Sequence, residues 1–165
     1  MMTGLQQRAA RIRLAVFDVD GVFTDGRIWI GSDGVEYKAF SVRDGFGVKA
    51  LLAAGVEVAI ISGRSSPAVN KRMDELGVTR VVQGREDKAT ALEQLLQDTG
   101  IAVADVAYLG DDTPDVPAMR MVGLPGAVAD AHPDALAASA WVSTRPGGRG
   151  AVREFCELLL GAHAK

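Results

Sequence analysis

Short apolar runs alternate with helix-like runs along almost the whole chain, and this alternation constrains the fold more than any other feature. The apolar runs, each typical of a strand buried on both faces, cover residues 13–19, 56–61, 80–83 and 105–110, with weaker runs at 126–129 and 140–143. Apolar residues recur at helical spacing in the segments 44–54, 66–76, 87–98 and 151–160. Strand and helix in alternation predict a parallel sheet covered on both faces, with right-handed crossovers. We therefore expect an α/β fold, a three-layer Rossmann-like domain.

Length and composition predict one domain. The chain has 165 residues, of which 48% are hydrophobic, enough for one sizeable core. We find neither a repeat nor a low-complexity linker, so residues 1–165 are expected to form a single domain. The single cysteine, Cys156, excludes an intrachain disulfide and a multi-cysteine metal site. It lies on an apolar helical stripe and is expected in the core.

The net charge and the hydropathy of the chain limit the kinds of partner that we expect it to bind. The net charge of −3 does not suit a nucleic-acid-binding protein, which usually carries a basic face, so we expect no nucleic-acid partner. No apolar run approaches the roughly 18 residues that span a membrane. The first residues also lack the apolar core of a signal peptide. We therefore expect no membrane partner and a cytoplasmic location.

Residues 22–43 interrupt the alternation. They contain two extended runs joined around Ser32, Asp33 and Gly34, a pattern typical of a β-hairpin. The insert holds four of the nine aromatic residues of the chain, namely Phe23, Trp29, Tyr37 and Phe40. Because a two-stranded hairpin is marginal alone in water, this apolar ribbon is expected to pack on the same hairpin of another subunit. The insert therefore predicts a homo-oligomer.

Polar side chains gather at the carboxyl ends of the predicted strands, the edge at which open α/β sheets bind ligands. They follow the first, second and fourth strands and are Asp18, Asp20, Ser62, Asp111 and Asp112. Carboxylates crowded at one edge repel one another unless a cation holds them. Oxygen ligands without a histidine or cysteine cluster favour Mg²⁺ over zinc. The implied cofactor is Mg²⁺.

The same edge carries the groups that phosphoryl transfer needs. Asp18 is expected to attack phosphorus and form an acyl phosphate, while Asp20, two residues on and pointing to the same side, shuttles the proton. Ser62 can donate to a phosphoryl oxygen. Lys88, near the start of the helix after the third strand, can neutralise Asp18 and the developing charge. The sequence therefore predicts a phosphoryl-transfer site with these four catalytic residues.

These residues, in this order, resemble the four motifs of the haloacid dehalogenase superfamily. DVDGVFTDG at residues 18–26 is similar to the first motif, Ser62 in ISGR to the second, Lys88 to the third, and GDD at residues 110–112 to the fourth. The resemblance implies the fold of that superfamily. Relatives with large cap domains place them after the first motif, where this chain has only the hairpin of residues 22–43. No large cap domain is therefore expected.

From about residue 12 to residue 161 the chain resembles the 3-deoxy-D-manno-octulosonate (KDO) 8-phosphate phosphatases, a family of lipopolysaccharide biosynthesis. The resemblance lies in the stretches KAFSVRDGFGVKALL, EVAIISGR, YLGDDTPDVPAM, AVADAHP and GGRGAVREFCELLL. It implies hydrolysis to KDO and phosphate, with Asp18, Asp111 and the backbone carbonyl of Asp20 as Mg²⁺ ligands. The implied substrate contacts are Asp20, Ser41, Val42, Arg43, Asp44, Gly45, Lys49, Gly63, Arg64, Arg72 and Lys88.

The residue types at these positions suit an acidic sugar phosphate. Arginine and lysine side chains can bind both a carboxylate and a phosphate, and the implied contacts include Arg43, Lys49, Arg64 and Arg72. Lys49 departs from the arginine expected in relatives, which keeps the charge but loses the bidentate fork. Ser62 replaces a threonine common in relatives and keeps the hydroxyl.

Several of these residues also have simpler interpretations. Asp112 and Asp115 either support the metal ligands through hydrogen bonds or cap the following helix. The DxDG pair also occurs in calcium loops, but Val22 stands where such a loop needs an oxygen ligand. His132, which precedes a proline, is expected in a turn.

The C-terminal segment of about residues 144–165 is expected to take part in covering the site. Residues 144–150, TRPGGRG, carry Arg145 and Arg149 and are expected to be flexible. In the resembled family, hairpins pack around the centre of a homotetramer and the C-terminal segment can reach a neighbour's site, so Arg149 is expected to contact substrate there. The alternative is a plain linker before the last helix.

Two other functions stay open. The first is a phosphatase for the 9-phosphate of a nine-carbon sugar acid, such as an N-acylneuraminate; residues 43–45, Gly63 and Arg64 argue against it. The second is a non-catalytic oligomerisation module of the kind fused to nucleotide-sugar synthetases. The presence of every catalytic group argues against that role.

Overall fold

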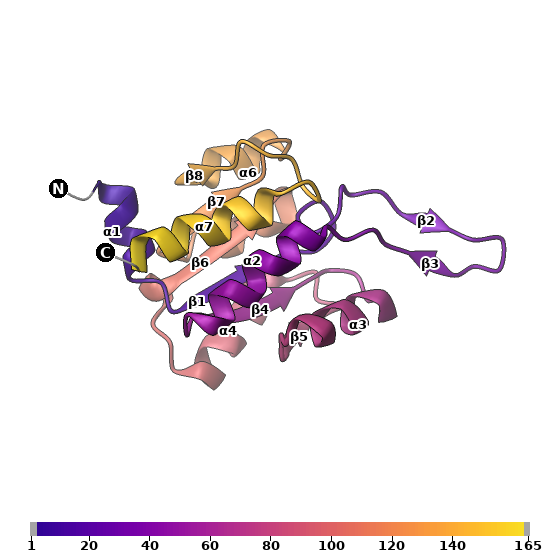
Figure 1. Ribbon diagram of the computed structural model, residues 1–165, viewed down its shortest axis with the longest axis horizontal. Coiled ribbons are helices and arrows are strands. Elements are labelled where there is room, and N and C mark those ends of the chain that lie inside the picture. The colour runs from indigo at the N-terminus through magenta and orange to yellow at the C-terminus, as the bar shows by residue number, and fades with distance from the viewer. Residues whose placement is uncertain (1–2, 164–165) are drawn as a thin grey trace.

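A six-stranded parallel sheet forms the centre of the computed structural model, which describes residues 3–163 (Figure 1). The strand order is β5-β4-β1-β6-β7-β8. The strands are β1 (Leu14–Phe17), β4 (Glu57–Ile61), β5 (Arg80–Val82), β6 (Val106–Gly110), β7 (Leu124–Ala127) and β8 (Trp141–Val142). Every residue of β1 is buried, and β1 pairs with both β4 and β6. The predicted parallel α/β sheet is confirmed.

Helices cover both faces of the sheet. One face carries α1 (Gly4–Ala10), α2 (Val42–Ala53), α3 (Pro67–Leu76) and α7 (Ala151–His163), and the other carries α4 (Lys88–Thr99), α5 (Val116–Met119) and α6 (Pro133–Ala138). Short 3-10 turns at Val103–Asp105 and Thr113–Asp115 lead into β6 and α5. No described helix is both long enough and apolar enough to cross a membrane.

Two short helices were not expected. Helix α1 starts at a capping box between Thr3 and Gln6, but it buries only Ala9 and so carries no apolar stripe in the sequence. Helix α6 starts at His132, whose Nδ1 accepts a hydrogen bond from the N–H of Asp134 at 3.2 Å. His132 therefore caps a helix, where the sequence suggested a turn.

The hairpin projects from the end of the sheet and consists of β2 (Trp29–Ile30) and β3 (Glu36–Tyr37) (Figure 1). Its exposed apolar residues include Trp29, 60% exposed, Ile30, 71% exposed, and Tyr37, 56% exposed. Within residues 3–163, this hairpin is the only pair of strands between β1 and α2, so the described chain has no large cap domain. The predicted hairpin without a cap is confirmed.

The aromatic residues assigned to the hairpin do not all lie on it. Phe23 is buried and packs edge-on against Phe17 of β1, with ring centroids 5.4 Å apart. Phe17 also meets Phe155 of α7 at 6.0 Å, and Phe155 meets Trp141 at 5.2 Å. Phe23 is therefore a core residue that fastens the loop after β1, and the expectation that it belongs to the hairpin that packs on another subunit is wrong.

Candidate active site

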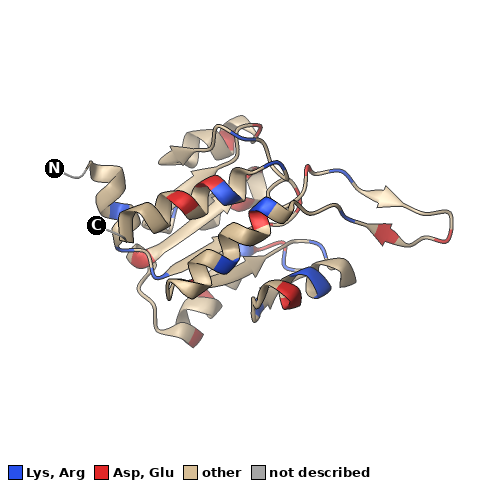
Figure 2. Ribbon diagram, in the orientation of Figure 1, with Lys and Arg blue, Asp and Glu red and all other residues tan. Residues whose placement is uncertain are grey.

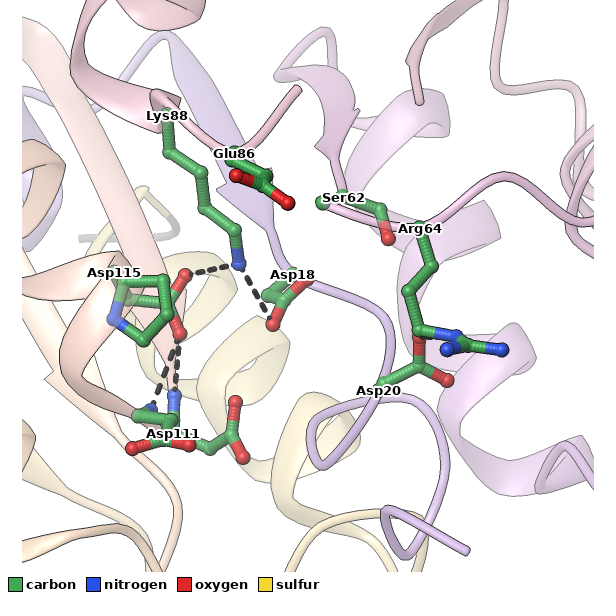
Figure 3. Close-up of a pocket in the computed structure, with 11 residues that line it drawn as sticks. Asp18, Asp20, Ser62, Arg64, Glu86, Lys88, Asp111 and Asp115 are labelled. Carbon is green, nitrogen blue, oxygen red and sulfur yellow. Dashed lines mark hydrogen bonds and ion pairs between the residues drawn. The ribbon is translucent and has the colours of Figure 1, made fainter. Parts of the chain in front are cut away.

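Strands β1 and β6 lie side by side at the point where the chain direction across the sheet reverses, which is where open α/β sheets bind ligands. A cavity of about 470 Å³ opens at their carboxyl ends. It is lined by all of the predicted catalytic and metal-binding residues and by their neighbours: Asp18, Asp20, Ser62, Gly63, Arg64, Glu86, Lys88, Asp111, Asp112, Pro114 and Asp115. Figure 3 shows Asp20, Ser62, Lys88, Asp111 and Asp115 arranged around Asp18.

The loop after β1 is held close to the loop after β6. The N–H of Asp18 donates to the carbonyl of Leu109 at 3.1 Å, which continues the pairing of the two strands. Gly21 has a φ of +89°, and a Cβ built there would lie 2.0 Å from Asp111 Oδ2. Because no side chain fits in that space, glycine is required for the two acidic loops to approach each other.

Lys88 lies between two carboxylates. Its Nζ is 2.9 Å from Asp18 Oδ2 and 2.7 Å from Asp115 Oδ1, and all three side chains are at least nine-tenths buried. Helix α4 presents Lys88 at its first residue, directly after Asp87, whose carboxylate accepts from the N–H of Thr90 at 3.1 Å and caps the helix. The start of α4 thus aims one ammonium group at the predicted nucleophile.

Asp115 organises the loop that carries Asp111. Its Oδ2 accepts from the N–H groups of Asp111 and Asp112, at 3.0 and 3.2 Å, and its Oδ1 accepts from the Tyr108 hydroxyl at 2.8 Å. Asp112 accepts instead from the N–H of Thr113 at 2.7 Å. Of the two interpretations left open for these residues, the capping role describes Asp112, whereas Asp115 supports the site through hydrogen bonds.

The carboxylates are crowded enough to need a cation. Oxygen atoms of Asp18, Asp111 and Asp115 lie within 4.8 Å of one another, and Asp111 Oδ1 is buried without a hydrogen-bond partner. Burial and the charge of Asp115 raise the pKa of Asp18 to about 7, and burial and the charge of Asp18 raise the pKa of Asp111 to about 9. An oxygen-only donor set with an unpartnered carboxylate oxygen fits Mg²⁺.

Asp20 and Ser62 lie across Asp18 from Lys88 and Asp115 (Figure 3). Ser62 is buried at the end of β4, where its N–H donates to the carbonyl of Val82 at 2.9 Å. Asp20 Oδ2 lies 3.9 Å from Nε of Arg64, whose side chain is 51% exposed at the rim of the cavity. This side of the cavity therefore offers a carboxylate, a hydroxyl and a cation to a ligand.

The residues predicted as substrate contacts on α2 and α3 do not line this cavity within one chain. Asp44 is fully buried and accepts from the N–H of Arg153 in α7 at 2.9 Å. Lys49 and Val42 are exposed on α2, and Ser41 caps that helix by accepting from the N–H of Arg43 at 3.2 Å. Their binding role stays a prediction.

Four other predicted contacts also do not line the cavity of Asp18. Gly45 leaves room for Arg72, because a Cβ at Gly45 would lie 2.3 Å from the Arg72 guanidinium. Arg43 and Arg149 line a second cavity of about 260 Å³, together with Arg145 and Arg153.

Two of the three glycines in residues 144–150, Gly147 and Gly148, are packed against the site loop, where flexibility was expected. The N–H of Gly147 donates to Asp130 Oδ1 at 2.9 Å, and the N–H of Gly148 donates to the carbonyl of Val22 at 2.9 Å. A Cβ at Gly147 would lie 1.7 Å from the carbonyl oxygen of Gly21. The segment therefore supports the loop that carries Asp18 and Asp20.

Four residues at the site were not singled out from the sequence. Glu86 lines the cavity, Tyr108 bonds Asp115, and Lys38 and Glu36 reach Asp20 and Arg64 from the base of the hairpin. The sequence held a signal for three of them. Tyr108 carries a hydroxyl group in an otherwise apolar strand. Glu36 and Lys38 are two residues apart, which places their side chains on one side of an extended segment.

Comparison with known proteins agrees with this geometry. The family model of haloacid dehalogenase-like hydrolases matches residues 78–153. The 3-deoxy-D-manno-octulosonate 8-phosphate phosphatase KdsC of Escherichia coli (strain K12) is 49% identical over 158 residues, which cover 96% of this chain and 84% of that protein.

Solved structures of enzymes with the same name also match this chain. The crystal structure of the Yersinia pestis 3-deoxy-D-manno-octulosonate 8-phosphate phosphatase matches with a TM-score of 0.96 and 48% identity, over 98% of this chain and 87% of that one. That of the Moraxella catarrhalis enzyme, in complex with a magnesium ion, a phosphate ion and a KDO molecule, matches with a TM-score of 0.97 and 44% identity, over 99% and 94%. With such identity over most of the length of these enzymes, the chain belongs to the 3-deoxy-D-manno-octulosonate 8-phosphate phosphatase family of haloacid dehalogenase-like hydrolases.

Proposed function

We propose that this protein is a magnesium-dependent phosphatase that hydrolyses 3-deoxy-D-manno-octulosonate 8-phosphate to KDO and inorganic phosphate. One observation carries the proposal: the buried Asp18 carboxylate is paired with Lys88 at 2.9 Å, beside Asp20, in a chain 49% identical to enzymes of that name. A cytoplasmic setting, in which the buried thiol of Cys156 stays reduced, is part of the proposal.

In the first step, Asp18 attacks the phosphorus atom. Lys88 binds Asp18 Oδ2, which leaves Oδ1 free to act as the nucleophile. The bond between phosphorus and the sugar oxygen breaks as the bond from Asp18 forms, and Asp20 gives its proton to the departing sugar oxygen. The products of this step are KDO and an aspartyl phosphate on Asp18.

In the second step, water attacks the phosphorus of the aspartyl phosphate. Asp20 takes the proton from that water, and the Asp18 carboxylate leaves, so that both residues return to their starting states. The Ser62 hydroxyl and the Lys88 ammonium bind the phosphoryl oxygens in both steps. A magnesium ion, held by Asp18, Asp111 and the backbone carbonyl of Asp20, would neutralise the clustered carboxylates and the phosphoryl group.

A second copy of the chain completes the substrate site in this proposal. The exposed Trp29, Ile30 and Tyr37 of the hairpin favour packing against other hairpins, and we propose a homotetramer. Cations on α2, α3 and the segment before α7 do not line the cavity of their own chain, which fits a site shared between copies. These cations are Arg43, Lys49, Arg72 and Arg149.

A phosphate-release assay on the purified protein tests the proposal. The substrates are KDO 8-phosphate, an N-acylneuraminate 9-phosphate and simple hexose phosphates, each with Mg²⁺ and with chelator. We expect KDO 8-phosphate to give the highest kcat/KM, and Asp18→Asn to abolish turnover. Preference for the nine-carbon substrate would assign the chain to the alternative phosphatase, and no turnover of any substrate would leave an assembly role.

A further inference from the structure

The base of the hairpin contains a lysine whose side chain is shielded from solvent. Lys38 follows β3, and its side chain is only 1% exposed although the hairpin projects from the domain. Its Nζ donates a hydrogen bond to Asp20 Oδ1 and lies 3.1 Å from Glu36 Oε1. A buried lysine with two carboxylate partners is costly to remove from water, so its position calls for an explanation.

Lys38 belongs to a closed ring of four charges. Arg64 Nη2 is 2.5 Å from Glu36 Oε2, and Arg64 Nε is 3.9 Å from Asp20 Oδ2. Each acid of the ring thus lies between the same two cations, Lys38 and Arg64. Hydrogen bonds from Lys38 and Arg64 hold the pKa of Glu36 below its ordinary value, so this side of the ring is ionised at neutral pH.

The ring joins three separate parts of the chain. Asp20 comes from the loop after β1, Arg64 from the loop after β4, and Glu36 and Lys38 from the hairpin. Figure 2 shows charged residues at the base of the hairpin, whereas β2 carries none. Figure 3 shows the other half of the ring, where Arg64 lies beside Asp20 at the edge of the cavity. The hairpin is therefore connected to Asp20 through Lys38.

We propose that Lys38 is a positioning residue for Asp20, and that Glu36 in turn positions Lys38 and Arg64. The inference rests on the proposed function, in which Asp20 carries the proton to the leaving oxygen. A carboxylate on a loop can rotate about its last side-chain bond. By binding Oδ1, Lys38 stops that rotation and leaves Oδ2 to face the reacting group, so the hairpin contributes to proton transfer without touching the substrate.

The dependence of the rate on the leaving group distinguishes positioning from a structural role. The sugar oxygen of KDO 8-phosphate departs as a poor leaving group and needs the proton of Asp20. The nitrophenolate of 4-nitrophenyl phosphate departs readily without one. A misplaced Asp20 therefore slows the first reaction selectively, whereas general damage to the fold slows both.

The test uses Lys38→Met, with Lys71→Met as the matched control on the exposed face of α3. Single-turnover rates are measured with enzyme in excess over each substrate, so that only the first chemical step is observed. For Lys38→Met we expect KDO release from KDO 8-phosphate to fall about 10- to 100-fold, and nitrophenolate release to stay within about threefold of wild type. Lys71→Met should match wild type with both substrates.

Glu36→Gln provides a second test that leaves Lys38 in place. It keeps the hydrogen-bonding shape but removes one charge of the ring, and we expect the same selective loss at a smaller size, about 3- to 10-fold. If Lys38→Met does not fold, the rates of Glu36→Gln with the two substrates test the inference. Equal losses with both substrates, or no loss with either, overturn the inference. A wild-type protein that releases nothing from KDO 8-phosphate overturns the proposed function instead.

Discussion

The Lys88 ammonium lies 2.9 Å from the Asp18 carboxylate, and both side chains are more than nine-tenths buried. Burial alone would lower the pKa of Lys88, but the charges of Asp18 and Asp115 outweigh it and raise the pKa above its ordinary value. The lysine is therefore charged at neutral pH. Its charge offsets the repulsion between two neighbouring carboxylates whose side chains are shielded from solvent.

Lys88→Met should remove most of the activity. Without the ammonium, Asp18 and Asp115 repel each other and the phosphoryl group loses a cation, so we expect kcat/KM to fall by more than about 100-fold. The uncompensated buried carboxylates should also lower the free energy of unfolding, by roughly 3 kcal/mol. Kinetics and urea unfolding measure both effects, with Lys71→Met as control. Activity within threefold of wild type would contradict the assigned role.

Mg²⁺ should stabilise the folded protein through Asp111. A cation relieves the repulsion between the buried carboxylates, so the Tm should rise with Mg²⁺ and fall again with chelator. Asp111→Asn removes one of the repelling charges, and we expect a metal-free Tm at or above that of wild type. The same variant should lose both the Mg²⁺-dependent rise and turnover. Asp74→Asn, on exposed α3 surface, is the control. A full Mg²⁺ response in Asp111→Asn would exclude it as a ligand.

Trp29→Asp should separate the subunits. The tryptophan is 60% exposed on the hairpin, and a charge there opposes burial against another hairpin. We expect light scattering to report a lower mass and the assay to report lower activity together. Val103→Asp places the same charge at an apolar residue that is 38% exposed and far from the hairpin along the strands, and it should change neither. A fully active monomer would rule out the shared site.

Glu154 should make stability depend on pH in the acid range. Burial opposes its ionisation, but bonds from Ser143 and from the N–H and hydroxyl of Thr144, at 2.8 and 2.9 Å, prevail and lower its pKa. The stability it contributes is therefore complete above the ordinary pKa of 4.5 and is lost as pH falls through the lower folded value. The difference in unfolding free energy between wild type and Glu154→Gln should shrink from pH 7 to about pH 3. Glu93→Gln, on exposed α4 surface, should show no such trend.

The sheet and the centre of the site could be predicted from the sequence because both depend on local patterns. An apolar run such as residues 106–110 is buried whatever the rest of the chain does, and the residue after a parallel strand must lie at its carboxyl edge. Asp18, Ser62 and Asp111 are therefore placed correctly from their positions after strands.

Contacts between distant segments leave no such pattern. Lys38 and Asp20 meet because the second strand of the hairpin returns to the loop after β1, and Phe23 packs on Phe17, which also contacts Phe155 of the distant helix α7. Neither contact produces a periodic pattern in the sequence. Helices α1 and α6 were missed for a different reason, since helices of seven and six residues bury too little to show an apolar stripe.

The close approach of Gly147 to the carbonyl of Gly21 also means that the loop of the nucleophile gains its support only after the nucleophile itself has been translated. Asp18 is translated early, but the glycine that supports its loop is translated after β8. A chain translated only as far as Asp111 contains Asp18, Lys88 and Asp111, but the backbone behind the nucleophile has no support from residues 147 and 148. The support of the nucleophile's loop is thus complete only once residues 147 and 148 have been translated.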